Sequence, residues 1–137
     1  MTIILRTVCL SCLASVLGLA GTTSGWLVDS KCYASMLDNR NAEEVSWDGN
    51  LAIRYCTPDK KTKSFAVVRW DDGSNFNFNP AGNEKAVELS LSADKNFVYR
   101  VNVTGETRRN TVEVDAISIA AKINRDGPGS PGVGSRR

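Results

Sequence analysis

The sequence predicts a small, mainly β domain with five strands and one helix between the third and the fourth strand. Two stretches, 65–79 and 97–119, each hold two runs of β-branched and aromatic residues around a polar segment, which is the pattern of a β-hairpin. A shorter run, 25–31, precedes them and supplies the first strand. Along 97–104 the side chains alternate so that one face can be buried and the other exposed, as expected of strands.

Residues 1–20 are predicted to be a secretory signal peptide. Arg6 is the only charged residue before Asp29, an apolar run from Thr7 to Ala20 follows it, and small residues occupy the cleavage positions. A membrane anchor is the alternative, but a span needs roughly 20 apolar residues and this run is shorter. We therefore expect an exported protein, secreted or periplasmic, with no stable membrane span after cleavage.

Cleavage of the signal peptide would also reduce the number of cysteines that can form a disulfide. Cys9 and Cys12 lie inside the predicted signal peptide, so the mature chain keeps Cys32 and Cys56. Two cysteines in an exported domain most often form one disulfide. The bond would close a loop of about 25 residues and contribute around 3–4 kcal/mol to stability by the chain-entropy argument.

The segment between these cysteines is expected to leave the sheet and return to it. Cys32 is predicted at the end of the first strand, and residues 33–50 read as polar and irregular. Asn50 could cap a short helix that contains Cys56, and Pro58 would end that helix. The disulfide would then staple a helical excursion, 33–63, onto the sheet.

The next hairpin begins with a run, 65–70, that is apolar on both parities, as expected of a strand covered on both faces. A strong turn signal, 71–74, follows it, and the return strand, 75–79, has one apolar face.

Residues 81–93 fit two structures. Asn83 followed by Glu84 suits a helix start, and good helix formers fill the first half, so a helix to about Leu91 is favoured. The strand alternative for 84–92 stays open because Val87, Leu89 and Leu91 also alternate with polar residues.

The last hairpin is expected to turn in the polar segment that contains Gly105. Val112, Val114 and Ala116 continue the buried face on the return strand, but Ile117 and Ile119 fall on the opposite parity. A β-bulge near Ala116 would absorb this slip.

The domain is therefore predicted to span 21–121, and a Gly/Pro/Ser/Arg-rich tail, 122–137, is predicted to be disordered because it has almost nothing apolar to bury. Residues 21–121 hold 12 basic and 14 acidic side chains, a net charge of −2, which argues against a nucleic-acid partner.

Five strands with a helix between the third and fourth follow the order of an OB-fold, a small Greek-key barrel. The sequence also resembles a family of small, uncharacterised, secreted bacterial proteins with OB-fold-like domains. The resemblance implies this fold and export but no activity, because the family has no assigned function. It rests on Gly25-Trp26, Asp29-Ser30-Lys31-Cys32, Cys56, Asp72-Gly73, Ala81-Gly82-Asn83, Val101-Asn102-Val103-Thr104-Gly105 and the run from Val112 to Ile117.

Members of that family often carry a further cysteine one helical turn before the position of Cys56, where this chain has Ala52, and a histidine shortly after that of Cys32. This chain has no histidine, which removes the commonest general base and neutral metal ligand. We accordingly predict no catalytic residue, metal or cofactor. The leading hypothesis is a non-catalytic binding or envelope-associated module, monomeric or weakly associating, whose ligand and partner the sequence does not identify.

A ligand face is one interpretation of the 65–79 hairpin, where aromatic side chains could stack bases or sugars. The alternative, which is favoured because a small barrel needs large inward side chains, is that its three aromatic residues fill the barrel and that Arg69 and Asn77 face outward. The candidate residues are Arg69, Trp70, Phe76, Asn77 and Phe78.

A secreted, nuclease-like hydrolase is the second hypothesis, by analogy of fold alone. It requires Asp29, Glu113, Asp115 and Arg100 to meet at one end of the barrel.

Overall fold

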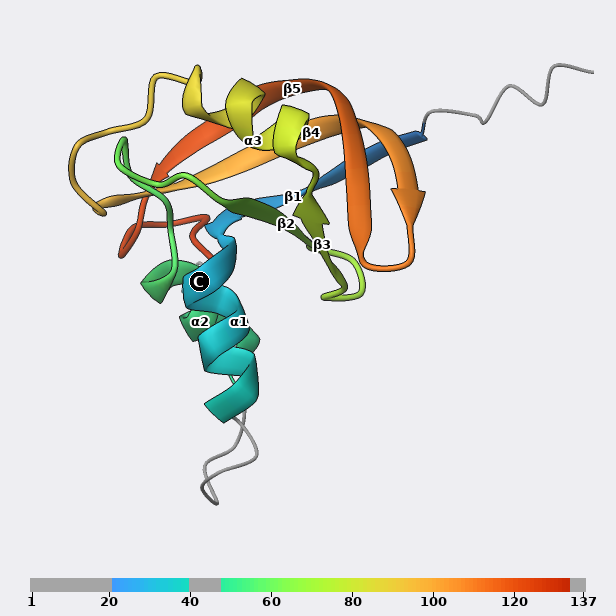
Figure 1. The fold of residues 1–137 in the computed structure, drawn as a ribbon. Helices are drawn as coiled ribbons and strands as arrows, with labels where there is room; N and C mark the ends of the chain where they lie inside the picture. Colours follow the sequence, from blue (N-terminus) through green and yellow to red (C-terminus); the bar gives the residue numbers. More distant parts are fainter. Residues whose placement is uncertain (1–20, 40–47, 134–137) are drawn as a thin grey trace, which may run out of the picture.

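The computed structural model describes residues 21–39 and 48–133 (Figure 1). The predicted signal peptide, with Cys9 and Cys12, lies outside the described residues. Within the described residues, no helix is both long enough and apolar enough to cross a membrane.

Five strands form one sheet that closes into a ring in the order β1-β2-β3-β5-β4, with β4 pairing back onto β1. All pairs are antiparallel except β3 with β5. The predicted mainly β architecture with five strands is confirmed. The strands are β1 (Gly21–Asp29), β2 (Phe65–Arg69), β3 (Asn75–Phe78), β4 (Phe97–Arg108) and β5 (Thr111–Asn124), and the helices are α1 (Ser30–Asn39), α2 (Gly49–Tyr55) and α3 (Pro80–Val87).

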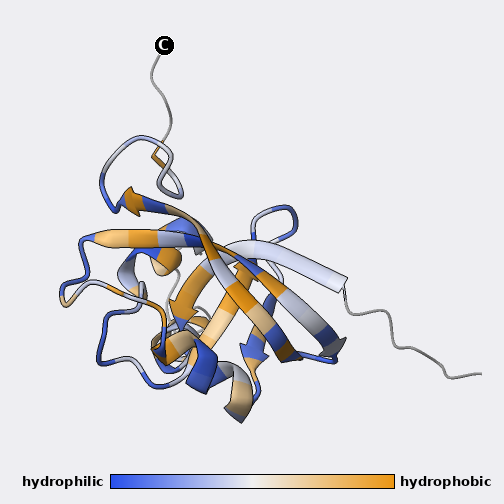
Figure 2. Cartoon of the chain, turned by 90° about the horizontal axis from the view of Figure 1, so that it is seen from above, coloured by the Kyte–Doolittle hydropathy of each residue, from blue (hydrophilic) through white to orange (hydrophobic). Residues whose placement is uncertain are grey.

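Strand parity divides the buried residues into two clusters. Leu27 points into the ring, whereas its neighbours Trp26 and Val28 point out of it. All three are buried because both faces of the sheet are covered here. The covering on both faces predicted for 65–70 is confirmed for residues 65–68 of β2, whereas Trp70 is exposed. Figure 2 shows the resulting bands of hydrophobic and hydrophilic residues along the long hairpin.

The inner cluster fills the ring. Its largest fully buried member is Tyr99, whose hydroxyl accepts a hydrogen bond from the Ser92 N–H (2.9 Å). This pairing satisfies the phenol in an apolar setting, where an unpaired polar group is unfavourable. The cluster consists of Leu27, Phe65, Val67, Phe78, Ala86, Leu91, Tyr99, Val101, Val103, Val112 and Val114.

The outer cluster lies between the sheet and the helices α1 and α2, which Figure 1 shows together below the ring. The Cys32–Cys56 disulfide, with its Cα atoms 5.5 Å apart, joins α1 to the residue that follows α2 and confirms the predicted pairing. The cluster consists of Trp26, Val28, Tyr33, Ala52, Ile53, Cys56, Ala66, Val68 and Val98.

Two details of this excursion were predicted wrongly. Cys32 lies in the first turn of α1 rather than at the end of a strand, because the Asp29 carboxylate accepts hydrogen bonds from the N–H groups of Lys31 and Cys32 and starts a helix there. The cap of α2 is Asp48 rather than Asn50.

The helix predicted within 81–93 is confirmed as α3, and the strand alternative is wrong, but the helix begins and ends earlier than expected. Its cap is Asn79 and not Asn83, Pro80 occupies the first turn, and it ends at Val87 instead of Leu91. The side-chain Oδ1 of Asn79 accepts from the N–H of Gly82 (3.0 Å) and also from that of Val114 (3.1 Å), so it ties α3 to β5.

Replacing Asn79 by alanine should lower the free energy of unfolding by about 2 kcal/mol, because a helix cap is lost together with a partner of the Val114 N–H. Asn79→Asp keeps the accepting oxygen and is the matched control. Chemical denaturation of both variants gives the measurement. Equal stabilities of Asn79→Ala and Asn79→Asp would contradict the role given to this oxygen.

The hairpin of β4 and β5 turns at Arg109 and Asn110, at the end of the polar segment in which the turn was predicted, and Gly105 is not part of the turn. Gly105 lies inside β4, opposite Val114. The predicted bulge is confirmed, because Thr104 pairs with Ala116 and leaves Asp115 as an extra residue.

The C-terminal segment, 122–133, also departs from the prediction. Residues 122–124, assigned to the disordered tail, form the end of β5, and 125–133 continue in hydrogen-bonded turns. Ser130 is buried and its hydroxyl donates to the backbone carbonyl of Arg125. Satisfied backbone groups thus order a glycine-rich segment that has little apolar surface. The remaining tail residues, 134–137, lie outside the described residues.

Candidate functional site

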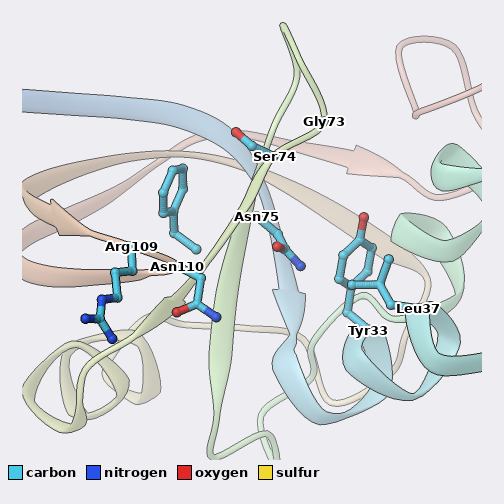
Figure 3. Close-up of a pocket in the computed structure, with 8 residues that line it drawn as sticks. Tyr33, Leu37, Gly73, Ser74, Asn75, Arg109 and Asn110 are labelled. Carbon is cyan, nitrogen blue, oxygen red and sulfur yellow. The ribbon is translucent and has the colours of Figure 1, made fainter.

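A groove of about 400 Å³ lies where three connections of the ring come together (Figure 3). One wall is α1, which follows β1. The second is the β2–β3 turn with the start of β3, and the third is the β4–β5 turn. The lining residues are Tyr33, Leu37, Gly73, Ser74, Asn75, Phe76, Arg109 and Asn110.

The α1 wall is held by the outer cluster. Tyr33 is buried in that cluster beside the disulfide residue Cys32, so the helix has little freedom to move away from the sheet. Figure 3 shows the Tyr33 ring and Leu37 side by side on the α1 side of the groove. This wall supplies apolar surface.

The β2–β3 turn forms the middle of the groove. Gly73 has φ of 73°, in the left-handed region that glycine adopts without strain. Its neighbour Asp72 accepts hydrogen bonds from the backbone N–H (2.9 Å) and hydroxyl (2.7 Å) of Ser74. These two bonds hold the pKa of the exposed Asp72 carboxyl below its ordinary value.

The β4–β5 turn brings a cation and an amide to the groove. Arg109 has φ of 55°, a left-handed conformation that is uncommon for a residue with a side chain. Among the described residues Arg109 forms no ion pair, and Asn110 accepts a hydrogen bond on its backbone carbonyl from Asn77 (2.8 Å). This bond joins the third wall to β3.

The groove therefore combines an apolar side, made by Tyr33, Leu37 and Phe76, with hydrogen-bonding groups on Ser74, Asn75 and Asn110. Such a lining suits a ligand that has apolar faces and many hydroxyl or amide groups. Within the described residues, no group of three or more histidine, cysteine or carboxylate side chains lies close enough together to hold a metal ion.

The structure separates the five residues of the predicted ligand face. Phe78 is buried inside the ring, as the alternative reading had it, and Phe76 is half-buried against the inner cluster while also lining the groove. Asn77 is exposed. The hairpin thus contributes Phe76 to the groove and Phe78 to the core.

The other two predicted residues lie outside the groove. Arg69 forms an ion pair with Asp71 (Nη2 to Oδ2, 2.7 Å). Trp70 is 53% exposed, so the alternative that it fills the barrel is wrong. Its ring stacks under the Arg100 guanidinium, 3.8 Å from the ring centroid.

Sequence reasoning missed most of the groove. Tyr33 and Leu37 were placed in an irregular segment, and Arg109 and Asn110 fall in the polar segment where the last hairpin was expected to turn. The Asp29-Ser30 pair ahead of Tyr33 was a usable signal, since an aspartate before a run of residues compatible with a helix marks a helix start.

The carboxylates required for a nuclease-like hydrolase do not meet. The carboxylate of Asp29 caps α1, whereas Glu113 and Asp115 are exposed on β5 on either side of the buried Val114. Within the described residues these carboxylates form no group that could hold a metal ion.

Comparison with known proteins finds no family model that matches this chain and no solved structure that matches it.

Proposed function

We propose that this chain is an exported, non-catalytic binding domain of the OB-fold type, and that it takes its ligand in the groove between α1, the β2–β3 turn and the β4–β5 turn. The strand order, the parallel pairing of β3 with β5 and the position of α3 between β3 and β4 support the OB-fold assignment. The predicted signal peptide and the disulfide support export.

The position of the groove carries the proposal. OB-folds bind oligonucleotides and oligosaccharides on the face of strands 2 and 3, between the loop after strand 1 and the loop after strand 4. The groove occupies this place, because its walls are α1 after β1, the β2–β3 hairpin and the β4–β5 turn.

The lining favours an oligosaccharide over a nucleic acid. Residues 21–121 carry a net charge of −2, so a polyanion would meet no general electrostatic attraction. Amide groups of Asn75 and Asn110 can pair with sugar hydroxyls, while the half-buried Leu37 and Phe76 offer apolar surface to the apolar face of a sugar.

The test is a titration of the ¹⁵N-labelled protein with a panel of neutral oligosaccharides, followed by backbone amide shifts. Binding should perturb residues of the three walls, and Asn110→Ala should weaken it by about fivefold to tenfold through the loss of one hydrogen bond. Lys95→Gln, an exposed change on the β4 side away from the groove, should leave the affinity unchanged.

A single-stranded oligonucleotide at low salt serves as the competing ligand. Tighter binding to the oligonucleotide, or shifts from every sugar that are confined to residues outside the three walls, would contradict the proposal.

A further inference from the structure

The side chain of Arg100 lies on the outer face of the sheet and does not line the groove. It stands directly opposite Trp26 in the β1–β4 pairing, with its guanidinium carbon 5.9 Å from the centroid of that ring and 3.8 Å from the centroid of Trp70. Among the residues that the structure describes, the Arg100 side chain has no carboxylate partner and no hydrogen bond. The two indoles fix the plane of the guanidinium and leave its N–H groups uncommitted.

A second set of donors lies two residues further along β4. Asn102 shares the outer face with Arg100 and pairs with Ser24 across the sheet. The Ser24 hydroxyl donates to the Asn102 Oδ1 (2.7 Å), so the acceptor of this amide is occupied and its NH₂ group remains available. Arg100 and Asn102 both line one small hollow beside Trp70.

Trp70 adds stacking surface. It is half-exposed although Arg100 covers part of it, and it lines a further hollow of about 150 Å³ that also contains Trp26 and Tyr33. The outer face therefore presents hydrogen-bond donors and a cation next to exposed indole surface. A ligand that fits has an anionic acceptor and an apolar ring face.

We propose that Arg100, Asn102 and Trp70 form a second ligand site, distinct from the groove, for a sugar that carries one carboxylate, as a hexuronate does. The flat carboxylate matches the two parallel N–H groups of a guanidinium, and the C–H face of the pyranose packs on the indole. One arginine neutralises one carboxylate, and the net charge of −2 over residues 21–121 disfavours a longer polyanion. A peptide carboxylate would use Arg100 but would leave Trp70 without a ring to stack on.

The experiment compares a disaccharide of glucuronate and glucose with cellobiose, its carboxyl-reduced counterpart. Both are titrated into the ¹⁵N-labelled full chain, with the Trp70 indole N–H and the Asn102 side-chain amide as reporters. The uronate should shift both signals, and cellobiose should bind at least about tenfold more weakly, as expected when a charge-assisted hydrogen bond is lost.

Three variants assign the contact. Arg100→Gln should reduce uronate affinity at least about tenfold, and Arg100→Lys should retain only part of it because lysine keeps the charge without the fork. Arg108→Gln makes the same charge change near the far end of β4 and should have no effect. Thermal melting checks that each variant folds. If Arg100→Gln does not fold, the loss of affinity in Arg100→Lys still tests the proposal.

Equal binding of the two disaccharides, or full uronate affinity in the Arg100 variants, would overturn the proposal. So would an absence of uronate binding, or an acidic peptide that acts through Arg100 where the uronate does not. Asn110→Ala, in the groove, should leave this affinity unchanged, which separates the second site from the first.

Discussion

Replacing both Cys32 and Cys56 by alanine should lower the free energy of unfolding by about 3–4 kcal/mol, because the bond closes a loop of 25 residues (sequence separation 24) that holds α1 and α2 together. For a domain of this size the melting temperature should fall by more than about 10 °C. Thermal melts of the double variant, and of the wild type with and without a reductant, give the measurement.

Without the disulfide, the α1–α2 region should unfold before the sheet does. The inner cluster makes no use of the disulfide, whereas Cys56 is fully buried in the outer cluster with Tyr33 and Ala52. Limited proteolysis of the double variant should therefore cut first between residues 30 and 56. Unchanged melting, or first cleavage in the β4–β5 hairpin, would mean that the sheet holds α1 and α2 without the bond.

The second large effect concerns Gly25. A Cβ atom at this position would overlap the backbone carbonyl of Val68, closer than side chains approach backbone atoms in folded proteins. Gly25 pairs with both β2 and β4, so the strand has no free direction in which to move. Gly25→Ala should cost about 3 kcal/mol, at the upper end of the usual range for overpacking, and equilibrium denaturation measures it.

Gly21→Ala is the matched control in the same strand. A Cβ atom at Gly21 meets no other atom within 4 Å, and alanine lowers the entropy of the unfolded chain, so this variant should be as stable as the wild type or slightly more stable. Equal losses in the two variants would show that close approach at Gly25 is not what determines the effect.

These two predictions concern the parts that place the candidate sites. The disulfide holds the α1 wall of the groove, and the close contact at Gly25 brings β1 against β2 beside Trp26 and Trp70. Loss of binding in either variant would follow from displaced walls and would not assign a contact to the ligand.

Local patterns in the sequence were sufficient to predict several features of the strands. The alternation of Tyr99, Val101 and Val103 marked the buried face of β4, and the parity slip at Ile117 located the bulge at Asp115. Both predictions succeed because side chains on a strand alternate with a period of two, so a register change must appear in the sequence. The disulfide followed from the count of cysteines and the expected export.

Other features depend on contacts between distant residues. The α1 segment is largely polar, and its helix is held by the cap from Asp29, the burial of Tyr33 and the bond to Cys56. Gly105 resembled a turn residue, but it allows β4 to approach the backbone carbonyl of Glu113, and the turn falls at Arg109 instead. Residue type alone does not distinguish a glycine in a turn from a glycine that lets two strands approach closely.

The sequence by itself determined the alternating strand faces and the disulfide, and it favoured the helix between β3 and β4, because residue spacing and the number of cysteines carry this information. Only the tertiary structure decided which side chains meet. Parallel pairing of Asn77 and Phe78 with Thr111 and Val112 brings the β4–β5 turn to β3, and closure of β4 onto β1 sets Arg100 opposite Trp26. Both candidate sites depend on these long-range pairings, which leave no local period in the sequence.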